Sequence, residues 1–329
     1  MSPVFAALPS YLRLRRYIPG ILNLHARSHS APTIAPLPTR LGVGPSTVGL
    51  PPGDWATLLD FLLARFPGVT EATWLGRMQA GDVVDEQGRP VRPDGPYRPH
   101  QRLYYYREIE DEPHIPFEER VLFQDAHLLV ADKPHFLPVT PTGKYLQESL
   151  LVRLKRRLGI DTLAPIHRID RGTAGLVLFC VDPAGRAAYQ KLFADRGVEK
   201  QYEAIVHWPA GRVLPAVRHS RLVPDASFLR TAEVPGEPNS TTYFELLERI
   251  GDDRARLRLS PVTGRKHQLR VHCNELGMPL VNDPIYPVLL PAAEDDHAAP
   301  LKLLAQQLAF SDPVTGEPRA FRSTLALDA

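Results

Sequence analysis

The sequence predicts an α+β protein in which a small α+β domain precedes a larger domain built on a largely antiparallel sheet. Short strand-like apolar runs, such as 121–123 and 127–131, are interspersed with amphipathic helical stretches such as 148–158. The apolar fraction of 43% and the charged fraction of 23% are typical of a globular protein. No apolar run approaches the roughly 20 residues that cross a bilayer, so we expect no membrane-spanning segment and no membrane partner.

Charge and cysteine content narrow the class further. The net charge of +2 over 329 residues neither demands nor excludes a polyanionic partner. The two cysteines, Cys180 and Cys273, lack C-x-x-C spacing, which disfavours a disulfide framework and a zinc site. We therefore expect a reducing compartment and take the cytoplasm as the predicted location.

The first 53 residues contain no acidic residue but five arginines, at positions 13, 15, 16, 27 and 40. We predict that residues 1–50 form a basic, disordered extension. An organelle-targeting peptide and an RNA-contacting arm are the alternatives that fit the same composition.

Residues 51–112 are predicted to form the small domain. Its helices and strands are expected at 55–66, 70–81, 83–84 and 102–107. Asp54 and Thr70 are the expected N-caps of the two helices. This pattern resembles the ribosomal-protein-type RNA-binding domain appended to many RNA-modifying enzymes, and a packing module without RNA contact is the alternative. The acidic, proline-containing run 108–116 is expected to be a linker.

The larger domain, 117–329, carries two basic stretches whose role the sequence leaves open. The predicted helix 148–158 has a basic face, which is either solvated or in contact with RNA. Arg254, Arg256 and Arg258 alternate along a predicted strand and so project from one face. They form either a track for phosphates or a charged guard on an edge strand.

A polar loop at 166–173 runs directly into the apolar strand 174–179 and carries one carboxylate, Asp170. Loops at strand ends are where catalytic groups tend to lie. Arg168 and Arg171 flank Asp170, and neighbouring cations favour the ionised carboxylate. An ionised carboxylate suits a nucleophile or an electrostatic stabiliser, although a structural salt bridge would have the same pattern.

Five ordered motifs give this loop a more specific meaning. They read FQDAHLLVADKP at 123–134, IHRIDRGTAGLVLF at 166–179, VEKQY at 198–202, TGRKHQLRVH at 263–272 and LAF at 308–310 followed by PVTGE at 313–317. The second resembles the H-R-[LI]-D-R-x-T-[SA]-G-L signature of the RluA-type RNA pseudouridine synthases, and the others resemble that family's further motifs in the same order. The resemblance spans roughly 120–322, and several ordered motifs are more specific than one alone.

The resemblance implies a pseudouridine synthase catalytic domain that isomerises uridine in rRNA or tRNA without any cofactor or metal. It makes Asp170 the nucleophile, Arg270 its cationic partner, and Tyr202 the residue that grips the base and removes the C5 proton. Arg168 is implied to fill the space that a flipped uridine leaves. Together with Arg168, the residues expected to bind RNA are Arg171, Arg265, Lys266, His267 and Lys133. No obligatory protein partner is implied.

Three positions of the sequence depart from the family motifs. Gly172 and Ala174 stand where the family more often has Asp and Ser, which bears on substrate preference, and Pro287 replaces a common Gly.

A catalytically silent RNA-binding protein is one alternative function, but a chain that had lost catalysis would be expected to have lost one of the three catalytic residues. A metal-dependent nuclease acting through His167 and Asp170 is another, and it would need further carboxylate ligands. We expect His167, His267 and His272 to be hydrogen-bonding histidines instead.

Overall fold

A computed structural model describes residues 36–109, 111–227, 229–291 and 293–328. These residues form two sheets and α-helices, so the predicted α+β class is confirmed. Most of the predicted basic extension, residues 1–35, lies outside the described residues. Its last part is ordered, because β1 (Ser46–Gly49) pairs with a strand of the small sheet. Within the described ranges, no helix is both long and apolar enough to cross a bilayer.

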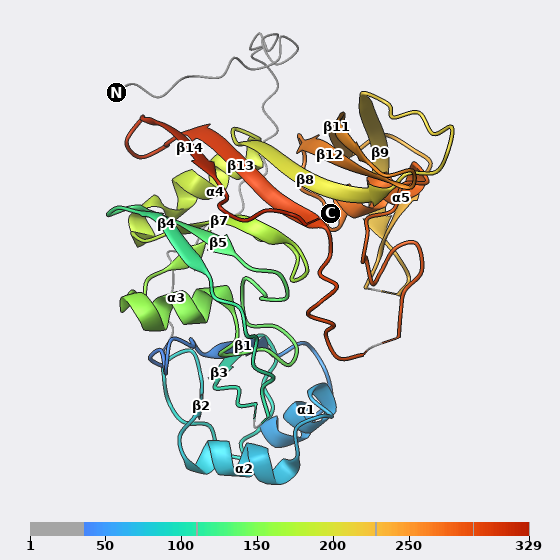
Figure 1. Ribbon diagram of the computed structural model, residues 1–329. Helices are drawn as coiled ribbons and strands as arrows, with labels where there is room; N and C mark the ends of the chain where they lie inside the picture. The colour runs from blue at the N-terminus through green and yellow to red at the C-terminus, as the bar shows by residue number, and fades with distance from the viewer. Residues whose placement is uncertain (1–35, 110, 228, 292, 329) are drawn as a thin grey trace. The chain divides into compact units, whose positions relative to one another are not determined.

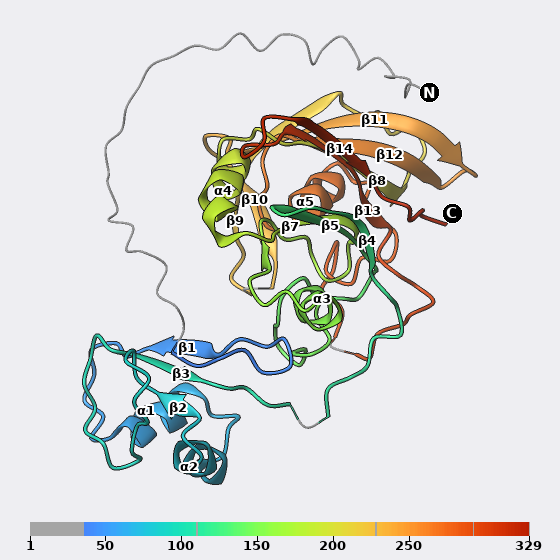
Figure 2. The ribbon, with the colours of Figure 1, turned by 90° about the vertical axis from the view of Figure 1, so that its left-hand side faces the viewer.

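The small sheet has the order β1-β3-β2 and lies against two helices, which Figure 2 shows on the same side of it. Its other elements are α1 (Leu58–Arg65), α2 (Glu71–Gln79), β2 (Val83–Val84) and β3 (Arg102–Tyr105). Trp74 and Phe61 are fully buried at the centre of its core. Thr70 caps α2 as predicted, but α1 is capped by Thr57 in a capping box with Asp60, so the Asp54 cap is wrong.

The large sheet has eleven strands and is almost entirely antiparallel, as Figure 1 shows. Its strands are β4 (Arg120–Gln124), β5 (Leu128–Lys133), β6 (Ala164–Pro165), β7 (Ala174–Cys180), β8 (Glu199–His207), β9 (Val217–Pro224), β10 (Thr231–Val234), β11 (Ser240–Ile250), β12 (Arg254–Pro261), β13 (Leu303–Ser311) and β14 (Pro318–Arg322). Nine of them follow the order β10-β9-β11-β12-β8-β13-β7-β5-β4, while β14 pairs with β13 and β6 with β7. Strands β13 and β7 are parallel, at Leu304↔Ala174 and Ala305↔Gly175.

Helices cover both faces of β5 and β7. Leu129 and Phe179 pack with α3 (Leu150–Leu158), whereas Leu128 and Leu178 pack with Tyr189 of α4 (Arg186–Ala194), which follows the short helix η2 (Pro183–Gly185). Strands that are covered on both faces are apolar at every position, because successive side chains point to opposite sides. This explains why 174–180 reads as a continuous apolar run.

On the basic face of α3, Arg156 and Arg157 are exposed, whereas Arg153 is held by internal contacts. Arg153 donates to the carbonyl oxygens of Ile115 and Phe117, at 2.7 and 2.6 Å, and pairs with Glu148. Glu112, from the predicted linker, accepts the backbone N–H groups of 146, 147 and 148, just before the helix begins. The helix therefore anchors the segment that leads into the large sheet, which is a structural role.

One face of β12 packs on α5 (Gln268–Glu275) through Leu257 and Leu259. The opposite face carries the alternating arginines. Arg258 pairs with Glu245 at 2.7 Å, and Arg256 pairs with Glu248 at 2.8 Å and with Glu203 at 3.6 Å. Because β12 is an inner strand, its arginines do not guard an edge. The pairing of Arg256 and Arg258 with glutamates also speaks against a free track for phosphates.

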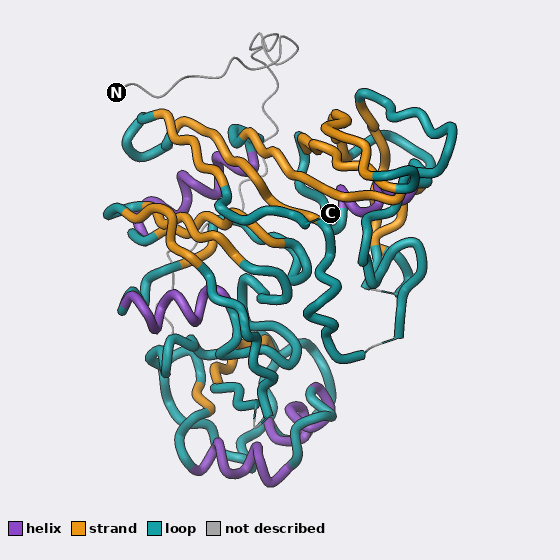
Figure 3. Tube along the Cα trace, in the orientation of Figure 1, coloured by secondary structure: helices purple, strands orange, loops and turns teal. Residues whose placement is uncertain are grey.

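The chain between α5 and β13 is a long loop, as Figure 3 shows. At the start of β7, Gly175 allows the backbone of β13 to approach closely. Its φ is +106°, and a Cβ there would lie 2.3 Å from the carbonyl oxygen of Ala305. The glycine of the T-A-G-L motif therefore holds the parallel junction beside the Asp170 loop.

Candidate functional site

Asp170 lies in the loop that joins β6 to β7, with its side chain 31% exposed. The backbone of this loop is tied internally, since the Thr173 N–H donates to the carbonyl oxygen of Asp170 at 3.1 Å. It is also held from behind by Lys133, whose amine donates to the carbonyl oxygen of Arg171 at 3.1 Å. The carboxylate is therefore presented from a fixed loop at the end of a buried strand.

Arg270, on α5, is the cation beside Asp170. Its Nη1 lies 3.1 Å from Oδ2 of Asp170, while Nε and Nη2 bind both oxygens of Asp283 at 2.8 and 2.6 Å. Arg270 is 5% exposed and Asp283 fully buried. Asp283 fixes the plane of the guanidinium, so one N–H group is aimed at Asp170. The carboxylates of Asp283 and Asp170 both raise the pKa of Arg270 despite its burial, so the arginine stays charged.

His267 and Tyr286 complete this side of the site. The Nε2 atom of His267 lies 3.8 Å from Asp170, and its Nδ1 lies 3.1 Å from the Tyr286 hydroxyl. Burial lowers the pKa of His267 to about 4, so the ring is neutral at neutral pH. His267 precedes α5 with φ of +55° and is largely buried, with one ring nitrogen facing the Asp170 carboxylate.

The turn before α5 is held by one glutamine. The Gln268 side-chain oxygen accepts from the Thr263 hydroxyl at 2.7 Å and from the Arg265 N–H at 3.1 Å. Its amide donates to the hydroxyl of Thr242 at 2.9 Å. The T-G-R-x-H-Q pattern therefore encodes a hydrogen-bonded turn that places Arg265 and Lys266 at the cavity and starts the helix that carries Arg270.

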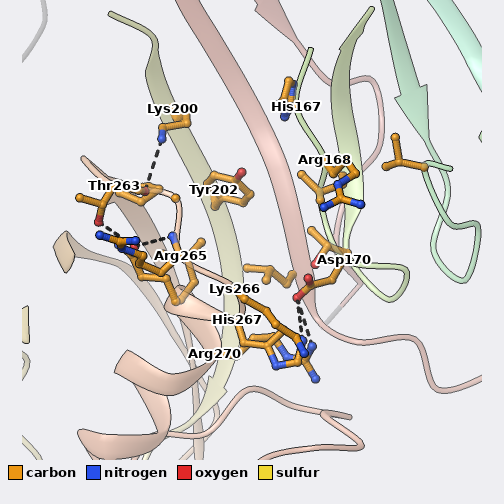
Figure 4. A pocket seen from close by; sticks show the side chains of 18 of the residues that line it. His167, Arg168, Asp170, Lys200, Tyr202, Thr263, Arg265, Lys266, His267 and Arg270 are labelled. Atoms are coloured by element: carbon orange, nitrogen blue, oxygen red, sulfur yellow. Dashed lines mark hydrogen bonds and ion pairs between the residues drawn. The ribbon is translucent and has the colours of Figure 1, made fainter. Parts of the chain in front are cut away.

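Tyr202 lies on β8 and faces the cavity opposite Asp170, as Figure 4 shows. Lys200 and Tyr202 are two residues apart and therefore point to the same side of the strand. Burial, and then the charge of Asp170, raise the pKa of the Tyr202 phenol, so it stays protonated. The phenol ring forms a wall that is apolar except at its hydroxyl.

These residues line one cavity of about 890 Å³. Asp170 is the single carboxylate among the residues that line it, and it stands against a set of basic side chains. The basic residues that line the cavity are Arg168, Arg171, Arg196, Lys200, Arg265, Lys266 and Arg270. A concave site with one carboxylate and many cations suits a polyanionic ligand whose chemistry needs one anionic group.

The predicted RNA-binding residues divide in two. Arg168, Arg265 and Lys266 are exposed at the cavity, and within the described residues the Arg168 guanidinium makes no hydrogen bond or ion pair. Lys133 is wrong as an RNA contact, because it is fully buried and donates to the carbonyl oxygens of residues 134, 137 and 171. It makes no ion pair with Asp132 either, whose carboxylate binds residues 323 and 324.

Arg171 also differs from its prediction. It binds both oxygens of Asp295 at 2.6 Å each and lies 5.4 Å from the Tyr145 ring centre. Its guanidinium is therefore held by the loop before β13, while its side chain stays 37% exposed and lines the cavity. The cation that pairs with Asp170 is Arg270, not either of the arginines that flank it in sequence.

The histidines behave as the sequence suggests. His167 accepts the Leu178 N–H at 3.1 Å through Nε2, and burial lowers its pKa to about 3. His272 is fully buried among the hydroxyls of Ser220, Ser240 and Thr242. Within the described part of the chain, no three His, Cys, Asp or Glu side chains are grouped as metal ligands would be.

Three site residues were missed. Lys200 lies within the motif at 198–202, and Asp283 lies eleven residues after the motif at 263–272. Neither the partner of an arginine thirteen residues away nor the direction of one lysine follows from a pattern. Arg196 has the weakest signal, a basic residue between Asp195 and Gly197. Only the fold brings it to the cavity.

Comparison with known sequences shows which enzymes this chain resembles. A family model described as RNA pseudouridylate synthase matches residues 127–275. The dual-specificity RNA pseudouridine synthase RluA of Haemophilus influenzae is 33% identical over 62% of this chain and 91% of that protein. RluA of Escherichia coli K12 is 31% identical over 62% of this chain and 91% of that protein. The mitochondrial tRNA pseudouridine(32) synthase of Saccharomyces cerevisiae is 32% identical over 51% of this chain and 37% of that protein.

A solved structure supports the fold. Human RNA pseudouridylate synthase domain containing 1 superposes with a TM-score of 0.51, covering 65% of this chain and 86% of that one at 23% identity. At that identity the likeness speaks for the architecture alone. The small sheet and its two helices fall before the stretch that the family model matches.

Proposed function

Since this chain belongs to the RluA family of RNA pseudouridine synthases and is therefore an isomerase, we propose that it converts specific uridines of rRNA or tRNA to pseudouridine with Asp170 as its nucleophile. The observation that carries the proposal is the arrangement Asp170–Arg270–Asp283. It places one ionised, oriented carboxylate in a cavity otherwise lined by basic and uncharged residues.

The chemistry needs little more than this carboxylate. The C1′–N1 bond of uridine breaks with its electron pair going to N1, and an Asp170 oxygen bonds to C1′. The uracil turns, C5 attacks C1′ and the carboxylate leaves. The C5 proton is then lost and N1 takes up a proton, so substrate and product have the same composition. Arg270 keeps Asp170 anionic and directed, which favours the attack.

Tyr202 is proposed to hold the base. A uracil between Tyr202 and Asp170 would stack on the phenol ring, which is the wall opposite the carboxylate. The raised pKa of Tyr202 favours this stacking role, because a protonated phenol cannot accept the C5 proton. If Tyr202 takes that proton, it must first lose its own, and Asp170, whose charge acts on it, is the candidate acceptor.

A uridine reaches this cavity only when it leaves the RNA stack, which costs a few kcal/mol. Arg168 is exposed at the cavity, two residues before the nucleophile, with no partner among the described residues. We propose that its guanidinium takes the place of the flipped base and offsets part of that cost. Arg265 and Lys266, across the cavity, are proposed to contact the flanking strand.

The names of the relatives bear on the substrate and the compartment. One relative acts on a tRNA position in mitochondria, and others are named for dual specificity. We propose rRNA or tRNA as the substrate and the cytoplasm as the compartment. The division into a small domain at 51–112 and a catalytic domain at 117–329, with RNA binding by the former, stays a prediction.

The test is pseudouridine mapping of total RNA from a strain without the gene, complemented with wild type, Asp170→Asn or Asp161→Asn. Deletion should remove one or a few pseudouridines, which wild type and the exposed control Asp161→Asn restore. Asp170→Asn keeps the size of the side chain but removes the nucleophile, so those sites should remain uridine.

Purified protein with transcripts spanning the lost sites separates loss of activity from loss of protein. Asp170→Asn should match wild type in its unfolding midpoint. Pseudouridine formed by Asp170→Asn at the wild-type rate would rule out Asp170 as the nucleophile.

A further inference from the structure

Two basic residues at one end of the cavity have no part in the chemistry above. Arg196 follows α4, and Lys200 is the second residue of β8, two residues before Tyr202. Both line the cavity that holds Asp170. Arg168, on the loop between β6 and β7, lines the same cavity, as Figure 4 shows.

Arg196 occupies a position where glycine is normally found. The Gly197 N–H donates to the Leu192 carbonyl at 2.8 Å and the Arg196 N–H donates to the Phe193 carbonyl at 3.1 Å, which is the Schellman pattern of a helix end. In this pattern the left-handed residue is usually glycine, yet here it is Arg196, with φ of +59°. The glycine comes one residue later, so Arg196 is held in a conformation that its own side chain disfavours.

Within the described residues, no carboxylate forms an ion pair with Arg196 or Lys200. The adjacent Asp195 is bound to Lys191 at 2.5 Å, and the single carboxylate that lines the cavity, Asp170, is paired with Arg270. Lys200 has one weak contact, a 3.4 Å hydrogen bond to the Thr263 carbonyl. Burial and then the charge of Arg196 lower the pKa of Lys200 to about 8. An exposed and a partly buried cation that repel each other gain stability when an anion binds between them.

We propose that Arg196 and Lys200 bind one backbone phosphate of the RNA strand, next to the flipped uridine. This inference rests on the proposed function and specifies how the same cavity takes its substrate. A phosphate fits because nucleotides flanking the uridine must pass the rim, and each carries one anion. Arg196 gives a planar donor pair and Lys200 a point charge, which are the two usual donors to phosphate oxygens.

The test compares Arg196→Gly, Lys200→Met and the control Arg120→Gln in fluorescence anisotropy. The probe is a labelled oligoadenylate with one central uridine, and a second set carries a neutral methylphosphonate on either side of that uridine. Arg120 is an exposed arginine of the edge strand β4 outside the cavity. Both cavity variants should bind about tenfold more weakly at low salt, with the slope of log affinity against log salt smaller by about 0.7. Arg120→Gln should bind like wild type.

The thermal midpoint distinguishes binding from a structural role. Arg196→Gly places the favoured residue at the left-handed position, so the protein should be as stable as wild type or more so while binding more weakly. One methylphosphonate should weaken wild-type binding as much as Arg196→Gly does, and should not weaken the variant further.

Either of two results would overturn the phosphate site. In the first, both variants bind RNA with the affinity and the salt slope of wild type. In the second, every methylphosphonate weakens RNA binding by a variant as much as it weakens binding by wild type. Failure of the proposed function looks different. In that case wild-type protein would form no pseudouridine in any RNA, and this inference would fall with it.

Discussion

At the scale of single residues, the site depends on a chain of charges that crosses the sequence. Asp170 is paired with Arg270, which lies one hundred residues later, and Arg270 is directed by Asp283. The two arginines that flank Asp170 in sequence do other things. Arg168 points into the cavity and Arg171 binds Asp295. Proximity along the chain therefore did not identify the partner of the nucleophile.

Asp283→Asn should destabilise the protein by about 3 kcal/mol, because it leaves a buried guanidinium without its bidentate carboxylate. Pseudouridine formation should fall as well, since Arg270 loses its orientation. Asp295→Asn is the matched control, since it breaks a similar pair whose arginine is 37% exposed and should cost less than about 1 kcal/mol. Urea unfolding measures both, and equal losses would contradict the importance we give to burial.

His272 should make stability depend on pH. Burial lowers its pKa from 6.5 to about 4, so the unfolded chain binds its proton first as the pH falls. Its contribution is complete above about pH 6.5 and is lost as the pH falls towards 4, by at most about 3 kcal/mol. Urea unfolding at neutral pH and near pH 5 should show a smaller decline for His272→Asn than for wild type. The exposed His100→Asn should decline as wild type does.

At the scale of elements, strands that are covered on both faces hold the site in place. The Asp170 loop ends in β7, and β7 meets β13 at the parallel junction beside Gly175. The Lys133 amine, at the end of β5, donates to the carbonyl oxygen of Arg171 in the same loop and to that of Leu137 in the neighbouring loop. Helix α5 then brings Arg270 to the carboxylate from the far part of the sheet. The catalytic geometry is therefore a property of three packed elements.

Gly175→Ala tests the junction. The added Cβ would meet the Ala305 carbonyl oxygen at 2.3 Å, and φ of +106° is unfavourable for alanine, so we expect a loss of more than about 2 kcal/mol. Gly76→Ala is the control, since this exposed glycine of α2 has open space around it and should gain up to about 1 kcal/mol. Thermal unfolding gives both shifts, and a neutral Gly175→Ala would mean that β13 can move away at little cost.

At the scale of the whole molecule, the two faces of the sheet differ in electrostatics although each carries arginines. On the cavity face, cations outnumber the single carboxylate, which is itself paired. On the opposite face, Arg256 and Arg258 are matched by glutamates of β8 and β11. Since long-range attraction to RNA follows unbalanced charge, the cavity face should be the one that RNA approaches.

Arg265→Gln and Arg258→Gln compare the two faces. Arg265 is exposed at the cavity, and its removal should weaken binding of the uridine-containing oligoadenylate several-fold and reduce the salt slope by about 0.7. Arg258 is paired with Glu245, so its removal should change affinity less than about twofold. Fluorescence anisotropy over a range of salt concentrations measures both. A larger loss for Arg258→Gln would place RNA on the other face.

Local sequence patterns predicted several secondary-structure elements and the family of this protein. Periodicity and caps predicted α2 and the buried strand 174–180, and the order of motifs identified the family. The same motifs named Asp170, Tyr202 and Arg270, which the fold brings to one cavity. These predictions succeed because a side-chain period or a motif is written in consecutive residues, which the chain carries whatever it later contacts.

What a charged side chain does was decided by tertiary structure. Lys133 is buried under carbonyl oxygens, Arg171 is held by Asp295, and the β12 arginines are neutralised by adjacent strands. Arg196 reaches the cavity only because α4 ends beside it. By itself the sequence determined the fold class and the family, and it singled out Asp170 as the candidate nucleophile. Only the fold decided which cations are free for RNA, because a charge is neutralised by whatever lies near it in space, and spatial neighbours come from distant parts of the chain.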